Sequence, residues 1–236
     1  MQRTAVSGTA CTGVAEGMIE EMSDTVETEN AWYTELREQW KPDHVRLLLI
    51  GESAPDDKGD PAARRFFYSD RLTGKDALFR AVVHAELDTP YLDSKTETKE
   101  RWLEQLRDRG IFLIDLVPYP INAASGTSRA AARRANVSDC VARARALQPD
   151  GIIVCHGPSH RLLKPALTEA RLPLLHDERI PFPLGNWRAT FVERYRQAVE
   201  RLDSASYEAA SDEWESAGEQ TAWDATTGDG LDRTTR

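Results

Sequence analysis

One stretch limits the possible folds more than any other: four consecutive apolar residues, Leu47 to Ile50, followed at once by Gly51-Glu52-Ser53-Ala54-Pro55. A short run that is apolar at every position predicts a strand buried on both faces, as in a parallel sheet. In an open α/β sheet, ligands bind in the crevice beyond the carboxyl ends of the strands. The polar residues after this strand are therefore candidate site residues, unless the segment is only a turn with a solvated glutamate.

Three later segments repeat this pattern of an apolar run that ends in polar or turn-forming residues. Segments with helical spacing separate the runs, which predicts a mostly parallel sheet covered on both faces. We expect an α/β fold, a three-layer α/β/α arrangement with a four-stranded sheet in a single domain. The four predicted strands are 47–50, 111–117, 151–155 and 172–175. Their polar ends, which should converge on one rim, are Glu52-Ser53, Asp115, His156 and His176.

The acidic charge is concentrated at the two ends of the chain. The net charge is −9; residues 1–30 carry −5 and residues 204–236 carry −6, which leaves +2 for 31–203. We expect 1–30 and 204–236 to be disordered acidic segments and 31–203 to be the folded domain. A central segment, 31–203, with a net charge of +2 is compatible with a nucleic-acid partner.

Composition excludes several classes of protein. No apolar run approaches the roughly 20 residues of a membrane helix, and no secretory signal is recognisable, so we expect a cytoplasmic protein without a membrane partner. Three scattered cysteines, Cys11, Cys140 and Cys155, have no metal-type spacing. His156 and His160 lack a third ligand nearby in the sequence, so no metal site is predicted.

Individual residues leave two interpretations open. Phe66-Phe67-Tyr68 either fills the core or forms a platform for a flat ring. Asp115, inside an apolar run, either ties down a loop or faces a ligand. The arginines of 123–135, a segment that begins with small, flexible residues, either are solvated or contact phosphate. The loop 177–187 alternates apolar residues with prolines, so it either folds over the sheet edge or inserts into a nucleic-acid stack.

The polar segments, in their order, resemble motifs of the uracil-DNA glycosylase superfamily. Gly51-Glu52-Ser53-Ala54-Pro55 is similar to the water-activating motif of its glutamate-containing branch, with the proline one place late and Ser53 where some branches keep Asp or Asn. Asp115 stands where the base-reading Asn of that superfamily stands. His176 and the Pro181-Phe182-Pro183 loop look like the His-Pro-Ser motif and the intercalation loop, although Asp177-Glu178 replace Pro-Ser.

The resemblance, over roughly residues 44–203, implies a DNA-repair hydrolase that releases a deaminated base, uracil or a related one, taken out of the stack. Glu52 or Ser53 would position a water, and His176 would stabilise the leaving base. The implied substrate-binding residues are Gly51, Phe67, Tyr68, Asp115 and His156. The implied DNA-binding residues are Arg179, Ile180, Phe182, Leu184 and Arg188. Three cysteines cannot supply the four-cysteine iron–sulfur cluster of one branch, so we expect no cofactor, and we expect a monomer.

Two rival functions stay open on the sequence. The first is an α/β hydrolase of small esters, with Ser53 or Ser159 as nucleophile and a histidine as base, although no G-x-S-x-G elbow is present. The second is a non-catalytic protein of the same fold that binds nucleic acid or nucleotides.

Overall fold

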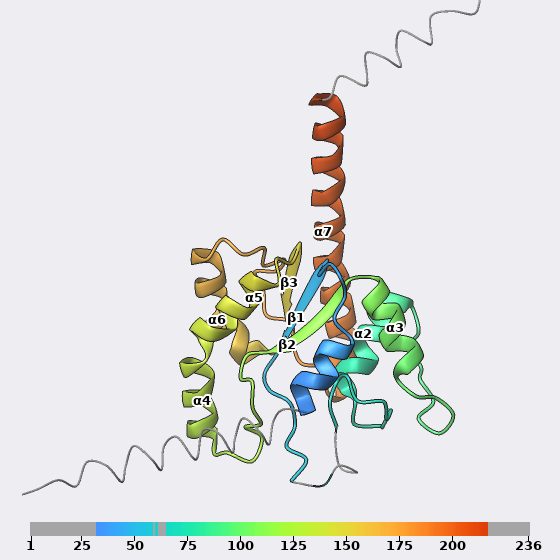
Figure 1. The fold of residues 1–236 in the computed structure, drawn as a ribbon, viewed down its shortest axis with the longest axis vertical. Coiled ribbons are helices and arrows are strands. Elements are labelled where there is room, and N and C mark those ends of the chain that lie inside the picture. The colour runs from blue at the N-terminus through green and yellow to red at the C-terminus, as the bar shows by residue number, and fades with distance from the viewer. Residues whose placement is uncertain (1–31, 59, 61–64, 217–236) are drawn as a thin grey trace, which may run out of the picture.

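The centre of the molecule is a sheet of three parallel strands in the order β2-β1-β3 (Figure 1). This computed structural model describes residues 32–58, 60 and 65–216. Strands β1 (Leu47–Gly51), β2 (Ile111–Asp115) and β3 (Gly151–Val154) are buried at every position. The mixed α/β class and the first three predicted strands are thus confirmed, because runs that are apolar at every position are buried on both faces.

The prediction of a fourth strand is wrong. The segment 172–175 adds a single parallel bridge, between Leu174 and Ile152. Ile152 donates its N–H to the Pro173 carbonyl at 2.8 Å and accepts from the Leu175 N–H at 3.0 Å. Pro173 has no N–H to extend this pairing, so the sheet has three strands rather than four.

Helices cover both faces of the sheet. One helix spans 32–39. The others are α2 (Ala77–Leu87), α3 (Glu100–Asp108), α4 (Gly126–Ala135), α5 (Val137–Ala146), α6 (Gly157–Glu169) and α7 (Arg188–Ser216), with a 3₁₀ turn, η2, at Gly185–Trp187. In Figure 1, α4, α5 and α6 lie on one side of the strands, and α2, α3 and α7 lie on the other, where α2 packs on α7.

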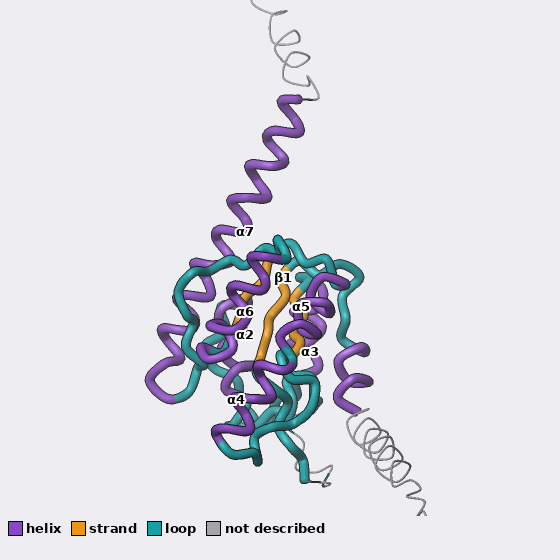
Figure 2. Tube along the Cα trace, turned by 90° about the vertical axis from the view of Figure 1, so that its left-hand side faces the viewer, coloured by secondary structure: helices purple, strands orange, loops and turns teal. Residues whose placement is uncertain are grey.

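Two segments are more ordered than the sequence suggested. Residues 126–135, expected to begin as a flexible segment, form α4, whose N-cap Ser125 accepts a hydrogen bond from the Ser128 N–H. Helix α7 continues past Asp203, where we expected a disordered tail, to Ser216. One face of its first half is buried, but residues 203–208 are exposed, and the helix projects from the body in Figures 1 and 2. Residues 1–30 and 217–236 lie outside the described residues.

The register of the strands aligns their carboxyl ends. Gly51 pairs with Asp115, and Ile50 pairs with Val154. Since all three strands run the same way, the residues that follow β1 and β3 emerge beside the end of β2, at one edge of the sheet. Within the described ranges, no helix is both long and apolar enough to cross a membrane.

Candidate functional site

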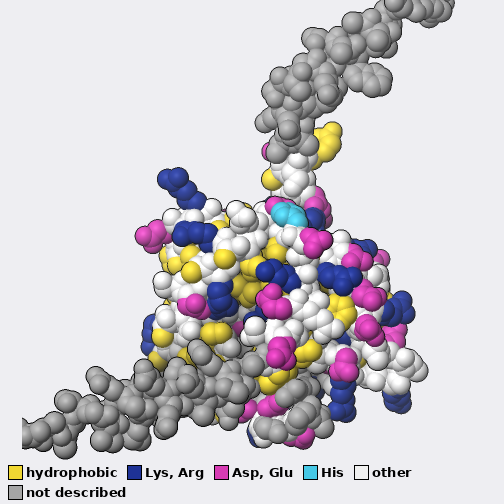
Figure 3. All heavy atoms as spheres, viewed as in Figure 1, with side chains coloured by type: hydrophobic (Ala, Val, Ile, Leu, Met, Phe, Trp, Pro, Cys, Tyr) yellow, Lys and Arg dark blue, Asp and Glu magenta, His cyan; other side chains and the backbone are white. Residues whose placement is uncertain are grey.

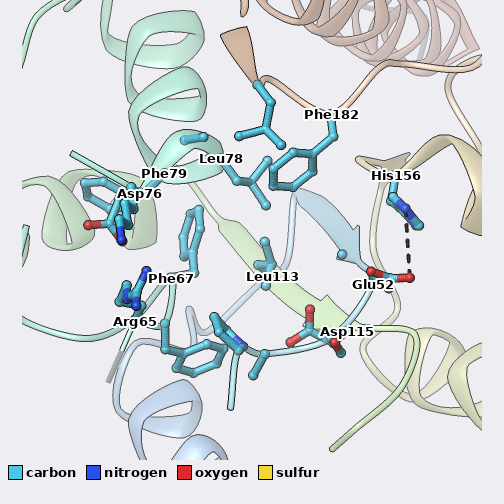
Figure 4. Close-up of a pocket in the computed structure, with 18 of the residues that line it drawn as sticks. Glu52, Arg65, Phe67, Asp76, Leu78, Phe79, Leu113, Asp115, His156 and Phe182 are labelled. Atoms are coloured by element: carbon cyan, nitrogen blue, oxygen red, sulfur yellow. Dashed lines mark ion pairs between the residues drawn. The ribbon is translucent and has the colours of Figure 1, made fainter. Parts of the chain in front are cut away.

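A cavity of about 450 Å³ opens at the carboxyl edge of the sheet (Figure 4). The loop after β1, the segment 65–67, the start of α2 and the loop before α7 form its walls. Eight residues predicted from the sequence line it: Gly51, Glu52, Ser53, Phe67, Asp115, His156, Phe182 and Leu184. Five predicted residues do not: Tyr68, His176, Arg179, Ile180 and Arg188.

Aromatic rings form one wall of the cavity. Phe67 and Phe182 point into it in Figure 4, and the Phe79 ring lies 5.3 Å from that of Phe67. Tyr68, which follows Phe67, is buried in the core, where its hydroxyl donates to the carbonyl of Leu113 and accepts from the N–H of the same residue. Of the two candidate stacking residues, only Phe67 can therefore meet a ligand.

Glu52 is held by two arginines from α4. Arg129 and Arg133, four residues apart and so on one face of the helix, each donate to one carboxylate oxygen. Burial would raise the pKa of Glu52, but the positive charge that His156 carries when it is protonated and the hydrogen bonds from Arg133 and Arg129 lower it. Glu52 is therefore a carboxylate at neutral pH. From the sequence, these arginines could be either solvated or in contact with phosphate. In the structure, they bind a residue of the site instead.

His156 lies beside Glu52. Its Nε2 is 4.0 Å from Glu52 Oε1, and its Nδ1 is 2.7 Å from the hydroxyl of Ser159 (Figure 4 shows the pair with Glu52). Burial lowers the pKa of His156, which Arg133 and Arg129 lower further against the opposing effect of Glu52. The ring is therefore neutral at pH 7 and faces the cavity as an uncharged hydrogen-bonding group.

Asp115 closes the floor of the cavity. Its Oδ2 lies 3.3 Å from Arg37 on the 32–39 helix. Its Oδ1 occupies space next to Gly51, where a Cβ on that glycine would lie 2.5 Å away. Burial raises the pKa of Asp115, although Arg37 and Arg143 oppose the rise. The sequence analysis predicted that Asp115 would lie at the carboxyl edge of the sheet, and Asp115 lines the cavity there. Nothing in the sequence indicated that Arg37 would be its partner.

The prediction of His176 as a catalytic residue is wrong, because this side chain does not line the cavity. Its Nε2 accepts the Val154 N–H at 2.9 Å, and its Nδ1 donates to the Glu178 carbonyl at 2.8 Å. The ring is buried and stacks on His160, and burial lowers its pKa to about 4. With both nitrogens bonded to backbone groups, His176 holds the chain after the 172–175 segment in place and has no group left for a ligand.

The loop before α7 divides into a core part and an exposed part. Ile180 is buried in the core, which corrects its predicted contact with DNA. Phe182 and Leu184 line the cavity, and Leu184 and Trp187 are about 60% exposed. Arg188 donates to the Pro90 carbonyl at 2.6 Å, so it ties the start of α7 to the loop after α2.

Behind the aromatic wall lies a buried ion pair that the sequence did not indicate. Lys99 is fully buried, 2.7 Å from Asp76 Oδ1 and 2.8 Å from the Phe66 carbonyl, with its ammonium 4.9 Å from the Phe79 ring centre. Burial lowers the pKa of Lys99, and Asp76 opposes this. The pair fixes the segment that carries Phe67.

The face drawn in Figure 3 mixes basic and acidic side chains around exposed hydrophobic atoms, without a large area of one sign. In the part of the chain that the structure describes, no group of three or more His, Cys, Asp or Glu side chains could hold a metal ion.

In comparisons with known proteins, no family model matches the chain and no curated protein matches its sequence.

Proposed function

We propose that this protein hydrolyses the N-glycosidic bond of a modified base taken out of a DNA strand. One observation carries the proposal: the same cavity joins ring surfaces suited to a flat heterocycle with an ionised carboxylate, Glu52, and a neutral imidazole, His156. Its volume of about 450 Å³ falls within the roughly 300–1,000 Å³ typical of small-ligand sites.

The aromatic wall and Asp115 supply recognition of the base. Phe67 and Phe182 offer faces and edges against which a planar ring stacks, a contact that tolerates different bases. Asp115 accepts hydrogen bonds, so it favours a ring edge that presents N–H groups. Uracil, hypoxanthine and xanthine each present a ring N–H, so a deaminated base fits this acceptor.

Glu52 and His156 supply the chemistry. The water oxygen forms a bond to the sugar C1′ while the C1′–N bond breaks, and the electron pair of that bond goes to the base. The anionic Glu52 accepts a hydrogen bond from the water and stabilises positive charge on the sugar, while His156 donates a hydrogen bond to the negative charge on the departing base. The water proton passes to solvent once the new C–O bond is made.

The exposed apolar residues beside the cavity suit a partner larger than a free base. Leu184 lines the cavity and is exposed. Trp187 lies within the same short turn, and its backbone N–H donates to the Leu184 carbonyl at 3.1 Å. An apolar side chain at such a position can enter the space that an extruded base leaves in a stack. Arg65 and Lys75, which line the same cavity and are exposed, supply positive charge for phosphates.

A second candidate, binding of a base or nucleotide without catalysis, is favoured by the two arginines on Glu52. A carboxylate that accepts from two guanidinium groups is a weak proton acceptor, and water competes with them for its oxygens. Ester hydrolysis has less support. Ser159, which does pair with a histidine, is fully buried, and among the described residues the Ser53 hydroxyl makes no hydrogen bond to a histidine.

The test is release of bases from duplexes that contain uracil, hypoxanthine or xanthine, with alkaline cleavage of the resulting abasic sites. Glu52→Gln and His156→Gln should each lower the rate at least about 100-fold while duplex affinity is retained. Glu169→Gln, on an exposed position of α6, and His44→Gln, at an exposed position outside the cavity, serve as matched controls with near-normal rates. Tight binding of the duplexes by the unaltered protein without any abasic product would establish the second candidate instead.

A further inference from the structure

The hydroxyl of Ser159 lies behind the imidazole of His156, on the side away from Glu52. His156 is the extended N-cap residue of α6, with φ −138° and ψ 116°, and Ser159 is the third residue of that helix. The Ser159 side chain is fully buried, and its Oγ lies 2.7 Å from His156 Nδ1. A buried hydroxyl cannot reach a substrate, so its effect on the cavity must pass through the ring.

The neighbours of the ring determine where its single proton resides. The Nε2 atom faces the Glu52 carboxylate at 4.0 Å, and an anion favours an N–H over a lone pair at that position. Nδ1 then carries the lone pair and needs a donor. Ser159 is placed to supply it, because a hydroxyl can donate to a ring nitrogen.

We infer that Ser159 is a positioning residue that holds His156 in its Nε2–H tautomer with that N–H directed at the cavity. This assignment stands on contacts alone, whereas its effect on base release rests on the proposed function. His176 provides an internal contrast. Its Nε2 accepts from a backbone N–H and its Nδ1 donates to a backbone carbonyl, so it is fixed in the opposite tautomer.

The experiment is nitrogen-15 correlation spectroscopy of the imidazole rings in the full chain at pH 7.5, with signals assigned through His156→Gln and His176→Gln. The unaltered protein should give an Nε2–H pattern for His156 and an Nδ1–H pattern for His176. Ser159→Ala should convert only the His156 signals to a mixture of tautomers. Ser159→Thr, which keeps the hydroxyl, should restore the pattern, and Ser204→Ala, on the exposed part of α7, should leave every ring unchanged.

Base release gives the second readout. Ser159→Ala should lower the rate about ten-fold, the value of one hydrogen bond of ordinary strength, with duplex affinity unchanged. An Nδ1–H pattern for His156 in the unaltered protein, or His156 signals that are identical in Ser159→Ala, would overturn the inference. Absence of base release with the expected ring signals would overturn the proposed function and leave the assignment of Ser159 standing.

Discussion

The imidazole of His156 and the carboxylate of Glu52 lie side by side, with Nε2 and Oε1 4.0 Å apart, although about a hundred residues separate them along the chain. The strand register brings them together. Ile50 pairs with Val154, and the Cys155 N–H donates to the Ile50 carbonyl at 2.9 Å, so both side chains leave the sheet at the same level. The distance between the two groups is thus set by the buried centre of the molecule rather than by mobile loops.

Loss of one arginine from Glu52 should change the pH dependence of base release. Arg133→Met removes a hydrogen bond that lowers the pKa of Glu52, so that pKa should rise. Because the ionised carboxylate is the active form in the proposed mechanism, the acid limb of the pH–rate profile should move to higher pH. Arg134→Met, at an exposed position of the same helix, is the control. Superimposable profiles for the two variants would contradict this role of Arg133.

Acidification should destabilise the fold through His176. Its folded-state pKa is about 4, below the ordinary value of 6.5, so the unfolded chain binds its proton first as pH falls. The stabilisation is complete above about pH 6.5 and is lost progressively down to about pH 4, on the order of 3 kcal/mol at most. Urea unfolding at several pH values measures this decline. His176→Gln should make the decline shallower, and an equally steep decline in that variant would assign it to other groups.

Lys99 should be far more important for stability than an exposed lysine. Lys99→Met leaves the Asp76 carboxylate buried without its cation, and breaking a buried pair in this way costs about 3–5 kcal/mol. Lys164→Met breaks the exposed pair with Asp177 and should change the free energy of unfolding far less, because solvent screens that pair. Free energies of unfolding from chemical denaturation give both values. Equal losses in the two variants would show that the buried pair does not hold the aromatic wall.

The exposed apolar residues near the cavity should contribute to duplex affinity but not to folding. Leu184→Ala and Trp187→Ala should each weaken binding of a duplex with an abasic site about ten-fold, since base–apolar contacts are worth about 1–3 kcal/mol. Their thermal midpoints should be unchanged, because both side chains are about 60% exposed. Tyr207→Ala removes another exposed aromatic, on the projecting part of α7, and should not alter binding. Unaltered affinity in the first two variants would place the duplex elsewhere.

The sequence alone predicted the features that depend on uninterrupted apolar runs and on the order of these runs along the chain. Uninterrupted apolar runs predicted β1, β2 and β3. The rule that ligands bind beyond the carboxyl ends of parallel strands predicted that Glu52, Asp115, His156 and His176 would meet, and the first three line the cavity. The run 172–175 includes Pro173, which lacks the N–H needed to extend the pairing, so it adds one bridge rather than a further strand.

The sequence could not predict the direction in which an individual side chain points. Phe67 and Tyr68 are adjacent, yet only the first faces the cavity. His176 follows an apolar run just as His156 does, but its ring turns back to the Val154 N–H. The spacing of Arg129 and Arg133 predicts a shared helix face, yet their common partner becomes evident only when the fold brings that face to Glu52, in the loop after β1.

Gly51 and the Asp115 carboxylate use the same small volume, since an added methyl on the glycine would overlap Oδ1. Substitutions at these two positions are therefore interdependent. Gly51→Ala should be harmful alone and largely tolerated once Asp115 is shortened to alanine, because the second change vacates the space that the first one fills. A chain that keeps its acid at position 115 can keep no side chain at all at position 51.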